Sequence, residues 1–139
     1  MADNKQEKPA ISLIIPAYCE EEAIGSVIQD AIKVLDTTGD SYEILVVDDG
    51  SPDNTGQVAQ KAGASVIEHA YNIGNGAAVK SGIRKAQGEI LVLMDGDGQH
   101  APQEIPEMLK LISEYHMVVG ARTGESDTEI HRDFGNAVY

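Results

Sequence analysis

Short apolar runs alternate along this chain with segments whose apolar residues recur every three or four positions. Runs of the first kind are typical of buried strands, and we expect five of them, at residues 11–15, 43–47, 64–67, 89–94 and 117–120. We expect Pro16 to end the first strand. Spacing of the second kind predicts helices, the clearest over residues 23–35. Further helices are expected after each of the next three strands, with Gly39, Gly63 and Gly88 as helix stops.

Regular alternation of strand and helix predicts an α/β fold, a mostly parallel sheet with helices on both faces, of the Rossmann-like kind. We expect residues 1–10 to be a flexible tail and residues 11–122 to form one domain. Residues 123–139 have little apolar periodicity, and we expect them to begin a further element that the chain does not complete.

Composition and charge exclude several classes of protein. With 139 residues, 42% of them hydrophobic, the chain suits one globular domain. No apolar run is long enough to cross a bilayer, and the first eight residues do not resemble a secretory signal. The 23 acidic against 10 basic residues give a net charge of −13, which disfavours nucleic acid. A single cysteine, Cys19, leaves no disulfide framework within the chain, and we expect its thiol to be buried.

Polar or glycine-rich sequence follows every predicted strand. In open parallel sheets, ligands bind outside the carboxyl ends of the strands. The segments that follow the five strands are residues 16–20, 48–51, 72–76, 95–97 and 120–122. The sequence therefore predicts a binding site along one edge of the sheet.

The strongest candidate within this edge is the pair Asp95 and Asp97. In an extended segment, residues i and i+2 point to the same side with Cα atoms ~6.6 Å apart, so both carboxylates could bind one hard cation. Mg²⁺ or Mn²⁺ suits such oxygen ligands. Gln99 would supply a third oxygen if the segment stays extended. The alternative is an ordinary turn at the end of a strand, and the spacing alone leaves both open.

Other residues at this edge have two interpretations each. Asp48 and Asp49 could accept hydrogen bonds from a nucleoside, or could belong to a turn in which Ser51 or Asp53 caps the next helix. The start of the helix near Gly76 offers free N–H groups to an anion, with Lys80 and Arg84 on one helical face. That face could equally be a solvated basic surface.

Arg122 could clamp a phosphate or form a surface salt bridge. His100, beside the acidic pair, is either a ligand or proton carrier or an exposed loop residue. His69, His116 and His131 show no metal-ligand spacing. The loop over residues 72–80 is not a P-loop, because the spacing Gly-x-x-x-x-Gly-Lys-Ser/Thr is absent. It is not a dinucleotide fingerprint either, because Val79 stands where the third glycine belongs and the loop follows the third strand and not the first.

Five strings in order resemble the nucleotide-binding half of family 2 glycosyltransferases with the GT-A fold, and most of all the polyprenyl-phosphate (dolichol-phosphate) mannosyl- and glucosyltransferases. They lie at residues 14–21 (IIPAYCEE), 46–51 (VVDDGS), 72–78 (NIGNGAA), 93–100 (LMDGDGQH) and 120–122 (GAR), and the resemblance spans residues 11–136. The family often has Asn at the position of Cys19.

This resemblance implies a role for each matched residue. The base and ribose pocket would be lined by Pro16, Ala17, Tyr18 and Glu20. Asp48 and Asp49 would contact the nucleoside. Asp95, Asp97 and Gln99 would hold the divalent metal on the donor's diphosphate, and Arg122 would face a phosphate. Residues 131–132 and 135–136 resemble the start of the acceptor-binding segment.

The resemblance further implies inverting transfer of a hexose from a GDP-mannose or UDP-glucose type donor to a polyprenyl or dolichyl phosphate, with Mg²⁺ or Mn²⁺. Such a protein would be cytoplasmic, acting at the cytoplasmic face of a membrane, and an apolar sheet edge would allow a homo-oligomer. One alternative is a nucleotide-sugar-binding module without turnover. A second is a sugar-nucleotide nucleotidyltransferase, which the acidic, glycine-free residues 17–22 disfavour. A phospho-acceptor receiver domain is disfavoured because its acidic pair would follow the first strand.

Overall fold

The computed structural model describes residues 7–120 of the chain. The chain divides into two compact units, residues 1–103 and residues 104–139. The first unit contains β1 (Ile11–Ala17), α1 (Ile24–Asp36), β2 (Tyr42–Asp48), α2 (Thr55–Ala62), β3 (Ser65–Glu68), α3 (Asn75–Lys85) and β4 (Ile90–Leu93). A short 3₁₀ turn, η1 (Pro102–Glu104), precedes α4 (Ile105–Leu111) of the second unit. Among the described helices, none has the length and apolar character needed to cross a membrane.

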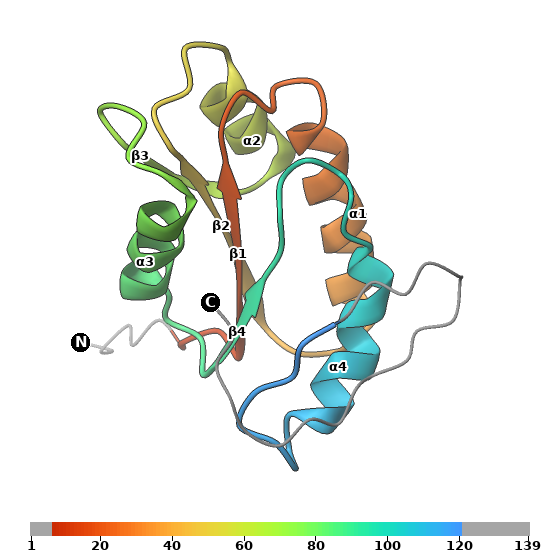
Figure 1. Cartoon of the computed structure of the whole chain (residues 1–139). Coiled ribbons are helices and arrows are strands. Elements are labelled where there is room, and N and C mark those ends of the chain that lie inside the picture. Colours follow the sequence, from red (N-terminus) through yellow and green to blue (C-terminus); the bar gives the residue numbers. More distant parts are fainter. Residues whose placement is uncertain (1–6, 121–139) are drawn as a thin grey trace, which may run out of the picture. The chain divides into compact units, whose positions relative to one another are not determined.

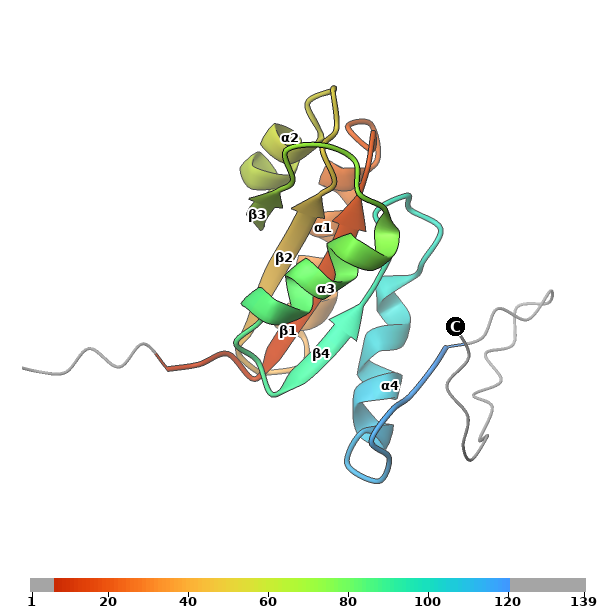
Figure 2. The same cartoon turned by 60° about the vertical axis from the view of Figure 1, so that its left-hand side comes forward.

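The four strands form one parallel sheet in the order β3-β2-β1-β4. Helix α3 covers one face of this sheet, and α1 and α2 cover the other (Figures 1 and 2). This arrangement confirms the predicted α/β, Rossmann-like fold with helices on both faces. The first four predicted strands and the helices between them are all present, with ends that differ from the prediction by a few residues.

Parallel pairing brings three strand ends to the same level. In the register of the sheet, Ala17 pairs with Asp48, and Asp48 pairs with Glu68. The next residues continue this alignment, because the Asp49 N–H donates to the Ala17 carbonyl at 2.9 Å and the His69 N–H donates to the Asp48 carbonyl at 2.9 Å. The loops after β1, β2 and β3 therefore begin side by side.

The core lies on both sides of β1, all of whose residues are buried. On one face, Ile14 and Val47 pack with Ala78 of α3. On the other, α1 buries a set of residues at helical spacing: Ile24, Val27, Ile28, Ala31 and Leu35. The nearly continuous apolar run that predicted a strand buried on both faces is thus explained.

Pro16 does not end the first strand, contrary to the prediction. It lies within β1 and pairs with Val47. Ile14 directs its carbonyl toward β4, where it accepts from the Met94 N–H, and Pro16 faces the same way because alternate residues of a strand share a side. Since β4 is paired with β1 only as far as Ile14, the N–H that proline lacks would have had no strand partner there.

The predicted fifth strand is also wrong. Residues 117–120 have no regular structure, and Met117 and Val119 are 75% and 60% exposed. A strand exists only where its backbone groups pair with a neighbour, and no residue of the described range 7–120 pairs with this segment. The apolar pattern that suggested a strand carried no information about a partner.

Gly82 sets how closely α3 approaches the sheet, and this generates a testable prediction. A Cβ at this position would lie 2.4 Å from Ile14 Cγ2 and 3.3 Å from Val47 Cγ2. We expect Gly82→Ala to lower the free energy of unfolding by about 1–3 kcal/mol, because the overpacked helix must move away. Urea denaturation measures the change.

Gly76→Ala on the same helix is the matched control, since a Cβ there meets nothing within 4 Å. We expect it to be neutral or to stabilise by up to about 1 kcal/mol through helix propensity. Equal effects of the two substitutions would contradict close packing at Gly82.

Candidate functional site

A pocket of about 360 Å³ lies at the carboxyl ends of the strands. Its walls come from the end of β1 and the following loop, the residue after β2, the start of α3 with its preceding loop, and the loop after β4. The lining residues are Pro16, Ala17, Tyr18, Glu20, Asp49, Asn72, Gly74, Asn75, Ala78, Asp95, Gly96 and Asp97. The edge of the sheet predicted from the sequence to bind a ligand is therefore hollowed.

Asp49 is the most constrained side chain of the pocket. Its Oδ1 accepts from the Ile73 N–H at 3.1 Å and contacts His69 Nδ1 at 2.7 Å, and its Oδ2 accepts from the Gly74 N–H at 2.8 Å. Burial by itself would raise the pKa of Asp49, but the hydrogen bonds from His69, Ile73 and Gly74 outweigh it and lower the pKa below its ordinary value. The carboxylate is therefore ionised at neutral pH and joins β2 to the loop that opens α3.

Asp48 has a different environment from Asp49, although the two are adjacent in the sequence. Its Oδ1 accepts from the Ser51 N–H at 3.0 Å, which closes the turn after β2. It lines a second, smaller cavity with Ser51 and Asp53, and it is not part of the wall of the main pocket. Successive residues at a strand end point to opposite sides, so only Asp49 reaches the pocket.

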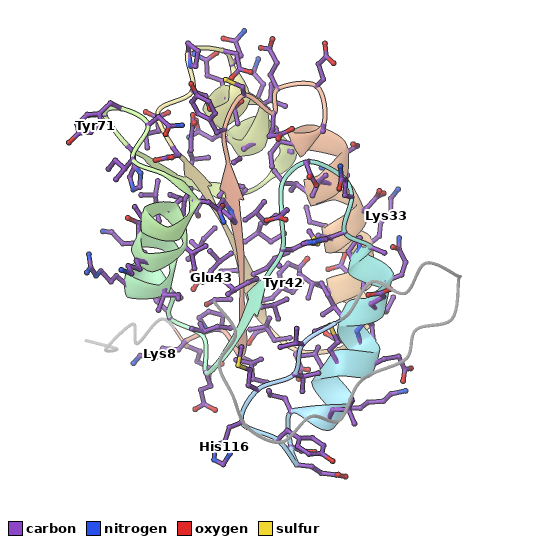
Figure 3. All side chains as sticks on the ribbon, in the orientation of Figure 1. Lys8, Lys33, Tyr42, Glu43, Tyr71 and His116 are labelled. Carbon is purple, nitrogen blue, oxygen red and sulfur yellow. The ribbon has the colours of Figure 1, made fainter. Side chains whose placement is uncertain are left out.

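Gly50 allows the loop before α3 to lie directly against the turn after β2. Its φ of 74° favours glycine, and a Cβ there would lie 2.5 Å from the Tyr71 carbonyl carbon and 2.7 Å from the Asn72 nitrogen. The Tyr71 side chain points outward from this loop (Figure 3). Gly50 and Asp49 together fix the position of the loop.

Hydrogen bonds join the loop after β1 to the loop after β2 and to the first residue of α2. Ser51 Oγ accepts from the Cys19 N–H at 2.9 Å, and Thr55 Oγ1 accepts from the Glu20 N–H at 2.9 Å. Cys19 has a φ of 54° and is exposed, so the expectation of a buried thiol is wrong. Because Asn adopts this left-handed conformation more readily than most residues, the backbone explains why Asn is common here in the resembling family.

Asp95 and Asp97 both line the pocket, but the segment that carries them is not extended. Strand β4 ends at Leu93, and the chain turns at Gly98, whose φ is 79°. Within this turn Asp97 Oδ1 accepts from the Gln99 N–H at 2.9 Å. The condition under which Gln99 would supply a third ligand is therefore not met, and Gln99 is not part of the pocket wall.

Gly96, between the two aspartates, explains how both reach the pocket. A Cβ at this position would lie 3.1 Å from Ile24 Cδ1 and 3.3 Å from both Ala17 Cβ and Ile15 Cγ2. The glycine therefore packs directly on the core, and the aspartates on either side line the same cavity. The segment is therefore a turn, and both aspartates nevertheless line one pocket.

The wall of the pocket is acidic, because Glu20, Asp49, Asp95 and Asp97 are among its residues. Burial raises the pKa of Glu20, and the nearby charges of Asp97, Asp53 and Asp95 raise it further. A diphosphate would be repelled from such a site unless a cation neutralised these carboxylates. His100 contacts Asp95: its Nδ1 accepts from the Asp95 N–H at 3.0 Å and its Nε2 lies 3.5 Å from Asp95 Oδ2.

The donor set of the pocket fits a divalent ion that is shared between two carboxylates and a bound ligand. Over residues 7–120, no three His, Cys, Asp or Glu side chains are grouped to hold a metal by themselves. Mg²⁺ and Mn²⁺, however, are commonly bound through one or two carboxylates together with substrate phosphates and water. Asp95 and Asp97 match that pattern and would share the ion with a bound diphosphate.

The remaining candidate residues lie elsewhere. Gly76 and Lys80 are exposed on α3 and do not contribute to the wall of the pocket, and Arg84 is exposed on the same helix. Arg122 and the proposed acceptor segment at residues 131–136 lie outside the described residues. Their roles stay predictions.

The residue that sequence reasoning missed is His69. It follows β3 directly, is 10% exposed, and contacts Asp49 through Nδ1 and Ser81 Oγ of α3 through Nε2 at 2.8 Å. Metal-ligand spacing, the criterion that the sequence offers for this histidine, does not detect a contact of this kind. Aligning the ends of the second and third strands, so that Glu68 pairs with Asp48, would have placed His69 beside Asp49.

Residues 12–136 match the family described as glycosyl transferase family 2. The chain belongs to this family. An undecaprenyl-phosphate 4-deoxy-4-formamido-L-arabinose transferase of Proteus mirabilis is 32% identical to this family 2 chain over 118 residues, which are 81% of this chain and 36% of the relative. An uncharacterised protein of Methanocaldococcus jannaschii is 36% identical over 125 residues, which are 86% of this chain and 49% of that protein.

Solved structures show the same relationship. Glucosyl-3-phosphoglycerate synthase from Mycobacterium tuberculosis, solved with phosphoglyceric acid, superposes with a TM-score of 0.64 at 28% identity, covering 75% of this chain and 39% of that one. A further structure of that enzyme contains Mn²⁺ and UDP-glucose, at the same identity and TM-score. This family 2 chain spans less than half the length of the relatives it matches.

The hydrogen bonds to Asp49 predict an acid-dependent contribution to stability. A carboxylate with a lowered pKa stabilises the fold fully above its ordinary value of 3.8, and this contribution is lost as pH falls through the lowered pKa. We expect Asp49→Asn to lower the free energy of unfolding by about 1–3 kcal/mol at pH 7, with the difference from wild type shrinking below about pH 4. Urea denaturation from pH 7 to pH 3 tests this.

Asp30→Asn is the control for Asp49→Asn, because this side chain is 52% exposed on α1. We expect a change within about 0.5 kcal/mol at pH 7. A difference between wild type and Asp49→Asn that grows toward low pH would contradict a lowered pKa.

Proposed function

We propose that this chain is the donor-binding part of a metal-dependent family 2 glycosyltransferase, which transfers a hexose from a nucleotide-diphosphate sugar to a polyprenyl phosphate. The observation that carries the proposal is the shared pocket, which is lined by Asp49 from the end of β2 and by Asp95 and Asp97 from the loop after β4. A nucleoside diphosphate has hydrogen-bond donors on its base at one end and anionic oxygens at the other. The pocket offers an acceptor carboxylate for the first and a cation-binding pair for the second.

The donor would lie along the strand ends. Tyr18 and Glu20 would flank the nucleoside, and Asp49 would accept a hydrogen bond from it. Asp95 and Asp97 would hold Mg²⁺ or Mn²⁺, which would supply Lewis-acid stabilisation of the charge on the departing diphosphate. The enzyme of known structure that contains Mn²⁺ and UDP-glucose supports this class of donor.

Lipid phosphate is the proposed acceptor. The undecaprenyl-phosphate relative supports it, together with the resemblance to polyprenyl-phosphate glycosyltransferases. An acceptor oxygen would attack the anomeric carbon as the bond from that carbon to the diphosphate breaks, with inversion. Because a phosphate is already anionic near neutral pH, this step needs little help from a general base.

Donor identity can be screened directly on this chain. We expect one of UDP-glucose and GDP-mannose, with Mn²⁺, to raise the melting temperature, since a ligand at 100 times its Kd stabilises the native state by about 2.7 kcal/mol. Differential scanning fluorimetry with and without Mn²⁺ measures the shift. If neither these nor other UDP- and GDP-sugars shift the melting temperature in the presence of Mn²⁺, the proposed function is wrong.

The metal-binding role of the acidic pair can be tested separately. We expect Asp97→Asn to weaken Mn²⁺-dependent binding of the donor by roughly tenfold or more, about 1.4 kcal/mol, because one anionic ligand of the ion is lost. Isothermal titration calorimetry is the measurement. Asp30→Asn, on the exposed surface of α1, removes the same charge away from the pocket and should leave the affinity unchanged. Unchanged affinity in Asp97→Asn would count against the metal site.

A further inference from the structure

Both ring nitrogens of His69 are engaged by groups from different elements. Nδ1 lies 2.7 Å from Asp49 Oδ1 after β2, and Nε2 lies 2.8 Å from Ser81 Oγ on α3. The side chains of His69 and Asp49 are only 10% and 5% exposed. The imidazole therefore forms a buried bridge between the sheet and the helix beside the pocket.

The chemistry of the partners determines the proton position on this ring. An ionised carboxylate only accepts hydrogen bonds, so Nδ1 carries the proton that Asp49 receives. In the neutral ring Nε2 is then an acceptor, and the Ser81 hydroxyl donates to it. The bridge thus has a direction, from Ser81 through His69 to Asp49.

The acceptor capacity of Asp49 is nearly used up by the protein itself. A carboxylate has about four lone-pair sites. His69, Ile73 and Gly74 occupy three of them. The remaining site belongs to a side chain that lines the pocket and can neither rotate nor move away without breaking these bonds.

The loop before α3 depends on the same carboxylate. Its Ile73 and Gly74 amides bond to Asp49, and Gly74 also lines the pocket, with Asn72 and Asn75 on either side. A change in the orientation of Asp49 would therefore displace two walls of the pocket together. His69, which belongs to neither of these walls, hydrogen-bonds to Asp49 from the end of β3.

We propose that His69 is a positioning residue for the nucleoside end of the donor site, which holds Asp49 with one acceptor site directed to the base and keeps the loop before α3 in place. This inference rests on the proposed function, because it assumes that a nucleotide occupies the pocket. His69 acts through Asp49 and does not itself line the pocket. The diphosphate end, at Asp95 and Asp97, is independent of it.

Two isosteric substitutions separate the contacts of the ring. The amide nitrogen of Asn lies as many bonds from Cβ as Nδ1 of His and, like it, donates. The amide oxygen of Gln lies as many bonds from Cβ as Nε2 and, like it, accepts. His69→Asn therefore retains a donor to Asp49, whereas His69→Gln retains only the contact to Ser81. We expect His69→Gln and His69→Ala to weaken binding of the selected nucleoside diphosphate with Mn²⁺ by about tenfold, and His69→Asn to restore most of the affinity.

Inorganic pyrophosphate with Mn²⁺ is the second probe, because it lacks the nucleoside. We expect its affinity to be unchanged in all three variants, and His116→Ala, at an exposed histidine, to leave both probes unaffected. Wild-type affinity for the nucleotide in His69→Gln and His69→Ala would overturn the inference and leave the proposed function intact. Equal losses of affinity for both probes would show a merely structural role and overturn the inference. Equal affinities of His69→Asn and His69→Gln for the nucleoside diphosphate would do the same. A wild-type chain that binds no nucleotide would overturn the proposed function itself.

A measurement on the unmodified chain needs no variant to fold. Long-range ¹H–¹⁵N correlation spectra should show His69 as the tautomer protonated at Nδ1, and hydrogen exchange should show protected amides at Ile73 and Gly74. In His69→Gln these two amides should exchange faster while those of β1 do not. The opposite tautomer, or unchanged exchange in the variant, would overturn the bridge from His69 to Asp49.

Discussion

The alignment of parallel strand ends is the constraint on which the site depends. Because Ala17, Asp48 and Glu68 share one level of the sheet, the loops that follow them begin as neighbours. Backbone geometry thus brings Tyr18, Asp49 and His69 together before any side chain contributes. The hydrogen bonds of Asp49 to the loop before α3 then extend this arrangement to the helix on one face of the sheet.

Charge gives the same edge its chemical character. The chain carries a net charge of −13, and several of its carboxylates gather around the pocket. Their mutual repulsion is visible in Glu20, whose pKa is raised by burial and by three neighbouring aspartates. Water and counter-ions can screen exposed charges, but a pocket partly removed from solvent needs a bound cation to accept an anionic ligand. An anionic ligand such as a diphosphate would therefore enter this pocket together with a cation.

Much of the fold could be predicted from the sequence because its signals are local. Apolar runs such as residues 11–15 and 43–47 mark strands buried on both faces, and Gly63 ends α2 in the left-handed conformation that glycine adopts most easily. Prediction failed where the outcome depended on a partner strand. Pro16 continues β1 because β4 has already ended beside it, and residues 117–120 form no strand because nothing in the described chain pairs with them.

The same distinction between local signals and contacts with other elements applies to the candidate site. The sequence by itself determined which residues follow each strand, and hence that Asp49, Asp95 and Asp97 lie at one edge of the sheet together with Tyr18 and Glu20. Only the tertiary structure decided that Asp49 and not Asp48 lines the pocket, that Gln99 lies in a turn outside it, and that His69 bridges Asp49 to Ser81. The type of each element and its place along the chain follow from periodicity within a short segment. The direction of a side chain follows from the register between strands and from contacts across them, which no single segment encodes.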